Sequence, residues 1–105
     1  MKIDSALQLL IDATNRGDSK AMLEAFTDDA VLIDFGRVFH GRSGIAQWDR
    51  NENIGTQNHL EITAVRHMPK STELAITVSG NGFNGTGHFL CNLKDGLISR
   101  LIITS

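Results

Sequence analysis

Apolar residues near the start of the chain recur at helical spacing. Leu7 and Ile11 fall on one face of a helix, and the polar residues 15–17 end it. Asp18 can cap a second, shorter helix, whose apolar residues share a face until a polar break at residues 27–29. The pattern therefore predicts two helices before the first strand.

A run of large apolar residues comes next and predicts a buried strand over residues 30–35. The glycine that follows permits a tight reversal into a short return strand at residues 38–39. Ser43 can then cap a third helix over residues 44–53. This helix carries the only tryptophan, Trp48, on the side that we expect to face the sheet.

The second half of the chain alternates between apolar and polar residues with period two. Leu60, Ile62 and Ala64 share one face of a strand, and a second strand after a polar turn alternates in the same way. Two further strands, at residues 86–93 and 97–104, are joined by a hairpin turn. Helices followed by an antiparallel meander predict an α+β fold with the helices on one face of the sheet.

Length and charge exclude several classes of protein. With 105 residues, of which 41% are hydrophobic and 21% charged, we expect one domain over residues 1–105. The net charge of −2 and the scattered basic residues leave no basic stripe for nucleic acid. No apolar run is long enough to cross a membrane, and residues 1–5 lack the pattern of a secretory signal. We therefore expect a cytoplasmic protein.

A homodimer is expected from the size of the chain and from its last strand. A domain of this size buries only about two thirds of its unfolded surface, so a ligand cavity would take area from its core. Both faces of residues 97–104 are apolar. A second copy that covers the outer face would compensate for the small core.

Three features that often indicate a catalytic, metal-binding or cofactor-binding site are weak evidence for one in this chain. The single cysteine, Cys91, lies in an apolar strand and is expected to be a buried, reduced thiol. The four histidines fall on different elements, without the spacing of metal ligands. Residues 80–87 satisfy a dinucleotide-binding pattern only formally, because a strand and not a helix follows them. We therefore expect neither a metal nor a cofactor.

Asp34 is the candidate catalytic residue, because a carboxylate inside a buried apolar strand requires an explanation. It could act as a general base in a pocket, or it could open the turn at residues 34–37 and pair with a nearby arginine. Trp48 likewise has two interpretations, as a pocket wall or as core. A pocket bounded by Trp48 and Phe89 would be apolar with one carboxylate, which is a usual form for small-molecule sites.

Four segments carry a resemblance to a known family. They are NRGD between the first two helices, FTDDAV before the first strand, HGRSGI at the third helix and GHFLCNLKDGLISRL in the final hairpin. In order and spacing they resemble the nuclear transport factor 2-like superfamily, particularly its SnoaL-like and ketosteroid isomerase-like branch. The resemblance covers essentially the whole chain. It implies a cystatin-like α+β cone, in which a curved antiparallel sheet wraps around an apolar pocket closed by three N-terminal helices, and pairing through the sheets.

The resemblance also implies roles for individual residues. Asp34 falls where ketosteroid isomerases keep the aspartate that moves a proton on the substrate, and Trp48 falls where they have a pocket aromatic. Leu10 stands at the position of the family's tyrosine, and Gly87 at the position of its protonated carboxylic acid. An enolate formed in this chain would lack both of those hydrogen-bond donors, so the resemblance does not favour steroid isomerisation.

These observations predict a protein that binds a small apolar or mildly polar molecule. In one hypothesis Asp34 is the general base of an isomerase, cyclase or hydrolase. In the alternative the chain is a non-catalytic ligand-binding or dimerisation module of the same fold. A second polar group facing Asp34 would favour catalysis, but strand register is not fixed by the sequence. The predicted substrate contacts are Trp48, Leu10, Asn51, His59, Phe89 and Arg100, of which Asn51, His59 and Arg100 are the candidates for that polar group.

Overall fold

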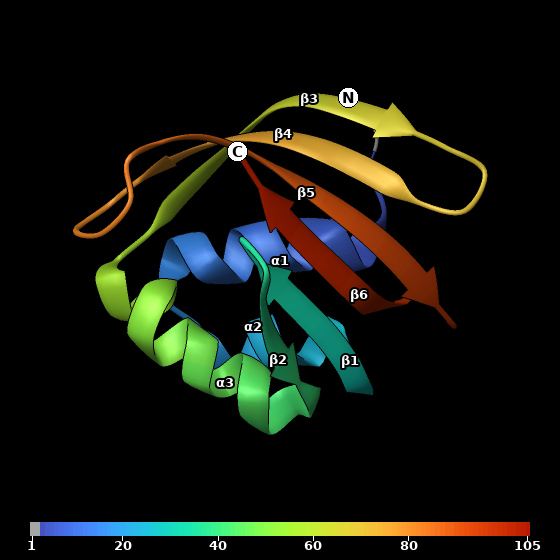
Figure 1. Cartoon of the computed structure of the whole chain (residues 1–105), viewed down its shortest axis with the longest axis horizontal. Coiled ribbons are helices and arrows are strands. Elements are labelled where there is room, and N and C mark those ends of the chain that lie inside the picture. Colours follow the sequence, from blue (N-terminus) through green and yellow to red (C-terminus); the bar gives the residue numbers. More distant parts are fainter. Residues whose placement is uncertain (1–2) are drawn as a thin grey trace.

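A computed structural model of the chain describes residues 3–105 (Figure 1). The first two residues of the segment in which we found no secretory signal lie outside this range. The described residues form helices α1 (Ser5–Arg16), α2 (Ser19–Glu24) and α3 (Gly41–Glu52), followed by a short 3₁₀ turn at Ile54–Thr56. The strands are β1 (Phe26–Asp34), β2 (Arg37–His40), β3 (His59–His67), β4 (Thr72–Ser79), β5 (Gly85–Lys94) and β6 (Leu97–Thr104).

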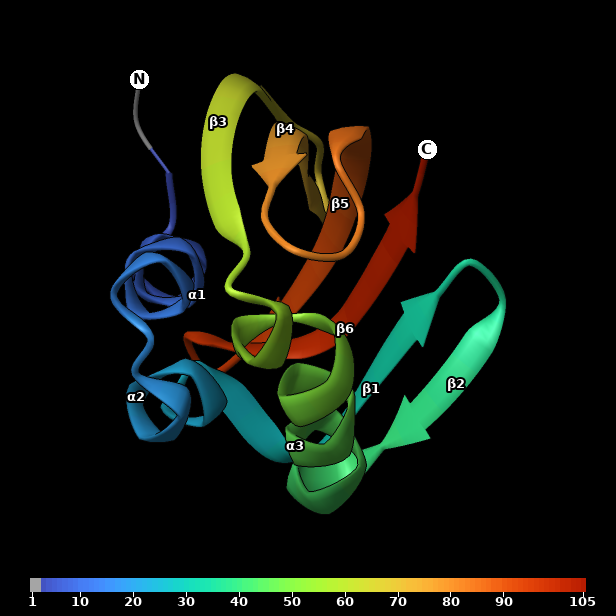
Figure 2. The same cartoon turned by 90° about the vertical axis from the view of Figure 1, so that its left-hand side faces the viewer.

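The strands form one curved sheet in the order β2-β1-β6-β5-β4-β3. Neighbouring strands are antiparallel except for β1 and β6, which run parallel. Figure 2 shows that the sheet bends around the three helices, which all lie on its concave side. The α+β fold predicted from the sequence, with helices on one face of a curved sheet, is therefore confirmed.

Two element boundaries differ from those predicted. Strand β1 begins at Phe26, so the polar residues 27–29 lie inside the strand and do not separate it from a helix. Phe26 is fully buried and pairs with Ile98 of β6, and this long-range pairing outweighs the local polar pattern. Helix α3 begins at Gly41, three residues before the predicted start, and His40 is its N-cap residue without a capping side-chain hydrogen bond.

The inner face of β3 changes part-way along the strand. A bulge lies between Ile62 and Ala64, where the pairing with β4 shifts by one residue. As a result Ala64 is exposed, and Val65 packs against the core in its place. The predicted alternation of Leu60, Ile62 and Ala64 is therefore correct only for its first two residues.

The core lies between the sheet and the helices, and its members are mainly branched aliphatic residues. Helix α1 contributes Leu7, Leu10 and Ile11, which are at most 4% exposed and lie on the face that periodicity predicts. The sheet faces them with inward residues of β4, β5 and β6, which include Leu74, Ile76, Phe89 and Leu101. The helix and the sheet thus bury their apolar faces against each other.

A buried polar cluster holds the end of α3 against the first two helices. Asp49 is 2% exposed and accepts hydrogen bonds from Ser19 Oγ at 2.8 Å, Asn53 Nδ2 at 2.9 Å and the Ile54 backbone N–H at 3.3 Å. Asn53 Nδ2 also donates to Thr14 Oγ1 at 3.1 Å. Because these buried groups satisfy one another, the cluster fixes the position of α3 without a covalent link.

Replacing Asp49 by alanine is therefore expected to destabilise the fold. The change removes one partner from the buried Asn53 amide and one from the exposed Ser19 hydroxyl, and a buried donor left without a partner costs about 1–3 kcal/mol. Chemical denaturation of Asp49→Ala measures the loss. The matched control is Asp12→Ala, which removes an exposed carboxylate on α1 that receives one surface hydrogen bond and should change stability by less than about 0.5 kcal/mol. Equal stabilities of the two variants would contradict a structural role for the cluster.

Candidate functional site

The site is built around the end of β1, where the chain reverses. Asp34 is the last residue of β1, and Phe35 and Gly36 form the turn with positive φ angles of 49° and 85°. The reversal pairs Asp34 with Arg37 at the start of β2. The backbone of this hairpin therefore places the carboxylate and the guanidinium side by side at the rim of the sheet.

One oxygen of the Asp34 carboxylate is held by two donors. Oδ2 accepts a hydrogen bond from Trp48 Nε1 at 3.0 Å and another from Arg37 Nη2 at 2.8 Å. Within the described part of the chain no hydrogen bond engages Oδ1, and no side-chain oxygen there is both fully buried and without a partner. Oδ1 is therefore open to a visiting molecule, although Asp34 as a residue is only 8% exposed.

Arg37 connects this carboxylate to the end of α3. Its guanidinium donates to both oxygens of Glu52, at 2.7 Å and 2.6 Å, and lies 5.7 Å from the centre of the Phe39 ring. The hydrogen bond with Glu52, more than the nearby charge of Asp34, raises the pKa of Arg37 above its usual value. The side chain of Arg37 is 54% exposed, so the ion pair between Arg37 and Glu52 lies at the surface.

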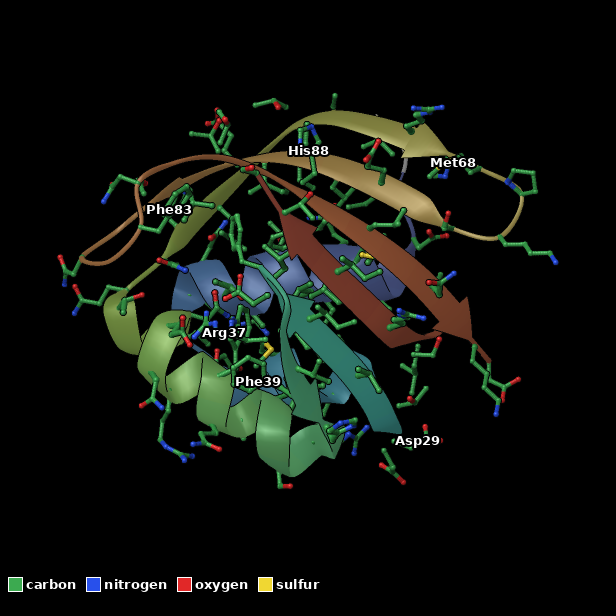
Figure 3. The ribbon with its side chains drawn as sticks, in the orientation of Figure 1. Asp29, Arg37, Phe39, Met68, Phe83 and His88 are labelled. Atoms are coloured by element: carbon green, nitrogen blue, oxygen red, sulfur yellow. The ribbon has the colours of Figure 1, made fainter. Side chains whose placement is uncertain are left out.

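A cavity of about 240 Å³ opens beside Asp34. Its wall is mostly apolar and combines the aromatic side chains of Trp48 and Phe89, which are buried, with those of Phe35 and Phe83, which are about half exposed. Figure 3 shows Phe83 and Arg37 toward the same side of the molecule, with Met68 at the opposite end. The aliphatic part of the wall consists of Val78 and Ile103, and Gly87 and Thr104 complete it. A mostly apolar cavity with a few polar groups is a usual form for a small-molecule site, and this one lies below the usual range of about 300–1,000 Å³.

The free cysteine and the possible metal ligands do not form a second site among the described residues. Burial raises the pKa of the Cys91 thiol to about 12, so it stays protonated near neutral pH and is a poor nucleophile, as expected for a buried free cysteine. Among residues 3–105, no three histidine, cysteine or acidic side chains lie close enough together to hold a metal ion. No helix in that range is both long and apolar enough to cross a bilayer.

A sequence model of the SnoaL-like domain matches residues 7–101. The chain belongs to the SnoaL-like domain family. Among solved structures, it is similar to that of a candidate polyketide cyclase from Sinorhizobium meliloti, with 25% identity, a TM-score of 0.86, and coverage of 97% of this chain and 95% of that one. No curated protein matches the sequence.

Two further structures share the fold of this SnoaL-like domain at low identity. A Catenulispora acidiphila protein with a ketosteroid isomerase-like fold, solved in complex with trimethylamine, is 16% identical with a TM-score of 0.85, and the match covers 99% of this chain and 87% of that one. A computationally designed 17-OHP binder is 18% identical with a TM-score of 0.84, and the match covers 95% of this chain and 87% of that one. At these identities the similarity shows the nuclear transport factor 2-like fold alone.

Three of the residues singled out from the sequence come together in this SnoaL-like domain. Asp34, Trp48 and Phe89 all line the cavity, and Trp48 also donates to Asp34. The two interpretations of Asp34 are both represented in the structure, since its carboxylate forms an ion pair with Arg37 and also reaches the cavity. Trp48 is likewise 4% exposed and part of the core while one side of it borders the cavity.

The other four predicted contacts do not line this cavity. Leu10 is 1% exposed and packs in the core beneath it. Asn51 is exposed on α3, and His59 is exposed at the start of β3, next to the inward residue Leu60. Arg100 is exposed because its inward neighbour on β6 is Leu101, and alternation then turns Arg100 to the convex face. None of the polar candidates named to face Asp34 is therefore in reach of the cavity.

The polar group that does accompany Asp34 is Arg37, together with its partner Glu52. The turn at residues 34–37 signals this arginine, since two residues three apart across a tight hairpin lie side by side. Glu52 and the cavity residues Phe83 and Ile103 have no local signal. They arrive from the end of α3, from the loop after β4 and from β6, so only the tertiary fold brings them together.

The hydrogen bond between Trp48 and Asp34 should be measurable as a coupling energy. Trp48→Phe keeps an aromatic ring and removes the N–H, and Asp34→Ala removes the acceptor. A double-mutant cycle analysed by chemical denaturation is expected to give about 1.5–3 kcal/mol, the range for hydrogen bonds to charged groups. As control, the cycle of Trp48→Phe with Asp29→Ala, at an exposed position near the other end of β1, should be additive. Additivity in both cycles would show that the bond contributes nothing.

Proposed function

We propose that this SnoaL-like domain binds a small, mostly apolar molecule in the cavity beside Asp34, and that Asp34 accepts a hydrogen bond or a proton from it. The observation that carries the proposal is that Asp34 lines a mostly apolar cavity while one of its carboxylate oxygens, Oδ1, has no hydrogen-bond partner among the described residues. A largely buried carboxylate gains most when a ligand supplies the donor that water no longer supplies.

The surroundings of Asp34 support an oriented acceptor. The two donors on Oδ2 come from different elements, Trp48 from α3 and Arg37 from β2, and they restrict rotation of the carboxylate. The carboxylate is then held in one orientation before any ligand arrives, with Oδ1 left without a donor. Such preorganisation lowers the entropy that binding has to overcome.

A second candidate function is proton transfer, with Asp34 as the general base of an isomerase, cyclase or hydrolase. A positioned carboxylate within reach of a bound molecule suits this role. However, the positions where the resemblance places oxyanion donors are occupied by Leu10 and Gly87, whose side chains donate no hydrogen bonds. The side-chain donors that line the cavity belong to Arg37 and Trp48, which are both engaged by carboxylates, and to Thr104. Loss of one oxyanion donor costs about 10²–10³ in rate, so the geometry supports binding better than enolate chemistry.

Proteins of the same fold hold small molecules of different polarity. One neighbour was solved with trimethylamine and another was designed to bind 17-OHP. For this chain the cavity of about 240 Å³ limits a ligand to one smaller than most drug-sized molecules. These observations support a binding role and leave the identity of the ligand to experiment.

Trp48 offers a direct test of binding, because it is the only tryptophan and borders the cavity. Titration with small hydrophobic and aromatic amines and alcohols should change its fluorescence in a saturable way. Asp34→Asn should weaken ligands that carry a donor by about tenfold or more, because a hydrogen bond to a charged acceptor is lost. Asp29→Asn removes an exposed carboxylate of the same strand and should leave affinity unchanged. Ligands that bind by calorimetry without altering Trp48 emission would place the site elsewhere.

We also infer that the chain forms a homodimer through the convex face of its sheet. Leu90, Ile33 and Ile102 lie on that face, and the register places Ile102 beside each of the other two. All three remain partly exposed in the single chain. His88, labelled in Figure 3, marks the same convex side, away from the helices. A contiguous apolar patch with a polar surround is the form expected of a protein interface.

Sedimentation measures this assembly directly. The unaltered protein should sediment with twice the mass of one chain at micromolar concentration. Ile102→Glu places a charge in the centre of the patch and should shift the equilibrium to the monomer, because burying an unpaired carboxylate is costly. Thr63→Glu, at an exposed position on the edge strand β3, is the control and should remain dimeric. A monomer mass for the unaltered protein would refute the dimer.

A further inference from the structure

The formal charges around the cavity do not cancel. Of the described residues that line it, three are charged: Asp34 and Glu52 carry carboxylates, and Arg37 carries a guanidinium. Two negative charges and one positive charge leave a net charge of −1 at a site with a mostly apolar wall. Because an apolar wall screens charge less well than water does, the cavity favours a ligand of positive charge.

Arg37 does not offer a free site for an anion. It forms two hydrogen bonds with Glu52 and one with Asp34 Oδ2, and both oxygens of Glu52 are occupied in return. A ligand carboxylate would have to compete with two carboxylates that the fold already holds in place. The polar groups of the cavity wall that remain for a ligand are Asp34 Oδ1, which can only accept a hydrogen bond or attract a positive charge, and the uncharged hydroxyl of Thr104.

The aromatic side chains are concentrated at this cavity. The chain has five phenylalanines and one tryptophan, and four of these six border the cavity. Trp48 and Phe89 are buried in its wall, whereas Phe35 and Phe83 are 55% and 53% exposed and lie where it opens. Aromatic rings attract cations through the negative potential of their faces, most strongly where water is partly excluded. The aromatic wall therefore favours the same kind of ligand as the net charge.

We propose that the ligand of this cavity is a small organic cation, in which an ammonium group with apolar substituents lies against Asp34 Oδ1 and the aromatic side chains. This inference rests on the proposed function, since it names the chemical class of the molecule bound in the same cavity. The positive charge of the ammonium group offsets the net negative charge of the cavity, and its apolar substituents contact a wall that is mostly apolar. Arg37 stays paired with Glu52 and supplies no contact to the cation.

Three probes of nearly equal shape separate charge from size. Choline carries a trimethylammonium group, its neutral carbon isostere replaces the nitrogen by carbon, and the tert-butylacetate anion carries a negative charge on a similar body. The NMR signal of the Trp48 indole N–H reports binding of each at low salt. Choline should bind at least about tenfold more tightly than the neutral isostere, and tert-butylacetate should bind most weakly. The preference for choline should decrease as salt is added.

Two variants locate the origin of the preference. Asp34→Asn keeps the shape of the side chain and removes its charge, so the advantage of choline over its isostere should fall by about threefold or more, and the aromatic rings account for what remains. Binding of the neutral isostere should be retained in this variant. Asp29→Asn makes the same chemical change at an exposed position and should keep the full preference. A preference that is undiminished in Asp34→Asn would overturn the inference.

The outcomes also separate this inference from the proposed function. If the neutral isostere or the anion binds the unaltered protein as tightly as choline, the cation inference is wrong and the binding function stands. The same holds if hydrophobic compounds shift the Trp48 signal and choline does not. If none of the probes or compounds affects Trp48, both the inference and the proposed function fail.

Discussion

Three elements of the fold meet at one oxygen atom. Asp34 ends β1, and its Oδ2 accepts hydrogen bonds from Arg37 of β2 and from Trp48 of α3. A carboxylate that is so largely buried is tolerated only where donors surround it, so these elements have to keep their relative positions. The position of α3 against the sheet is therefore linked to the group that faces the cavity. In this fold one side chain contributes both to the packing of the helix and to the chemistry of the site.

That shared role explains the character of the site. A carboxylate engaged on one side by an arginine and an indole is held in one orientation, and only its second oxygen remains for a ligand. Arg37 in turn is held by Glu52, so its guanidinium has a structural role and is not free to act as an electrophile. The arrangement is well suited to recognition of a donor. It provides little that would stabilise a negative charge forming on a bound molecule.

The sequence predicted the elements with strong periodicity well. The last strand has the bounds expected for it, and α1 ends where its polar residues and Gly17 indicate. The apolar pattern before residue 27 predicts a helix face that includes Phe26, because an apolar residue beside a polar segment has no local signal for a strand. In the structure Phe26 pairs with Ile98 of β6 and is therefore the first residue of β1. The bulge in β3 could not be foreseen either, since Ala64 and Val65 are both apolar and either fits the inner face.

Residues of the site could be predicted only where a side chain differs in polarity from its neighbours in the sequence. Asp34 contrasts with the apolar strand that it ends, and Trp48 with the polar helix around it. The polar group facing Asp34 was expected at Asn51, His59 or Arg100. The other interpretation, that Asp34 pairs with a nearby arginine across the turn, describes the contact with Arg37 that the structure contains. Sequence alone could not show that Glu52 reaches Arg37, because that contact depends on how α3 crosses the sheet.

The parallel pairing of β1 with β6 has a consequence for the order in which the site forms. Asp34 and Ile103 are register partners, so neighbouring parts of the cavity wall come from positions almost seventy residues apart in the sequence. As the chain is synthesised, the first helices and the β1–β2 hairpin emerge well before β6 exists. Contacts between such distant segments form late, because a long loop has to close first. A nascent chain therefore exposes Asp34 without the wall opposite, and a ligand can stabilise the protein only after the last strand has docked.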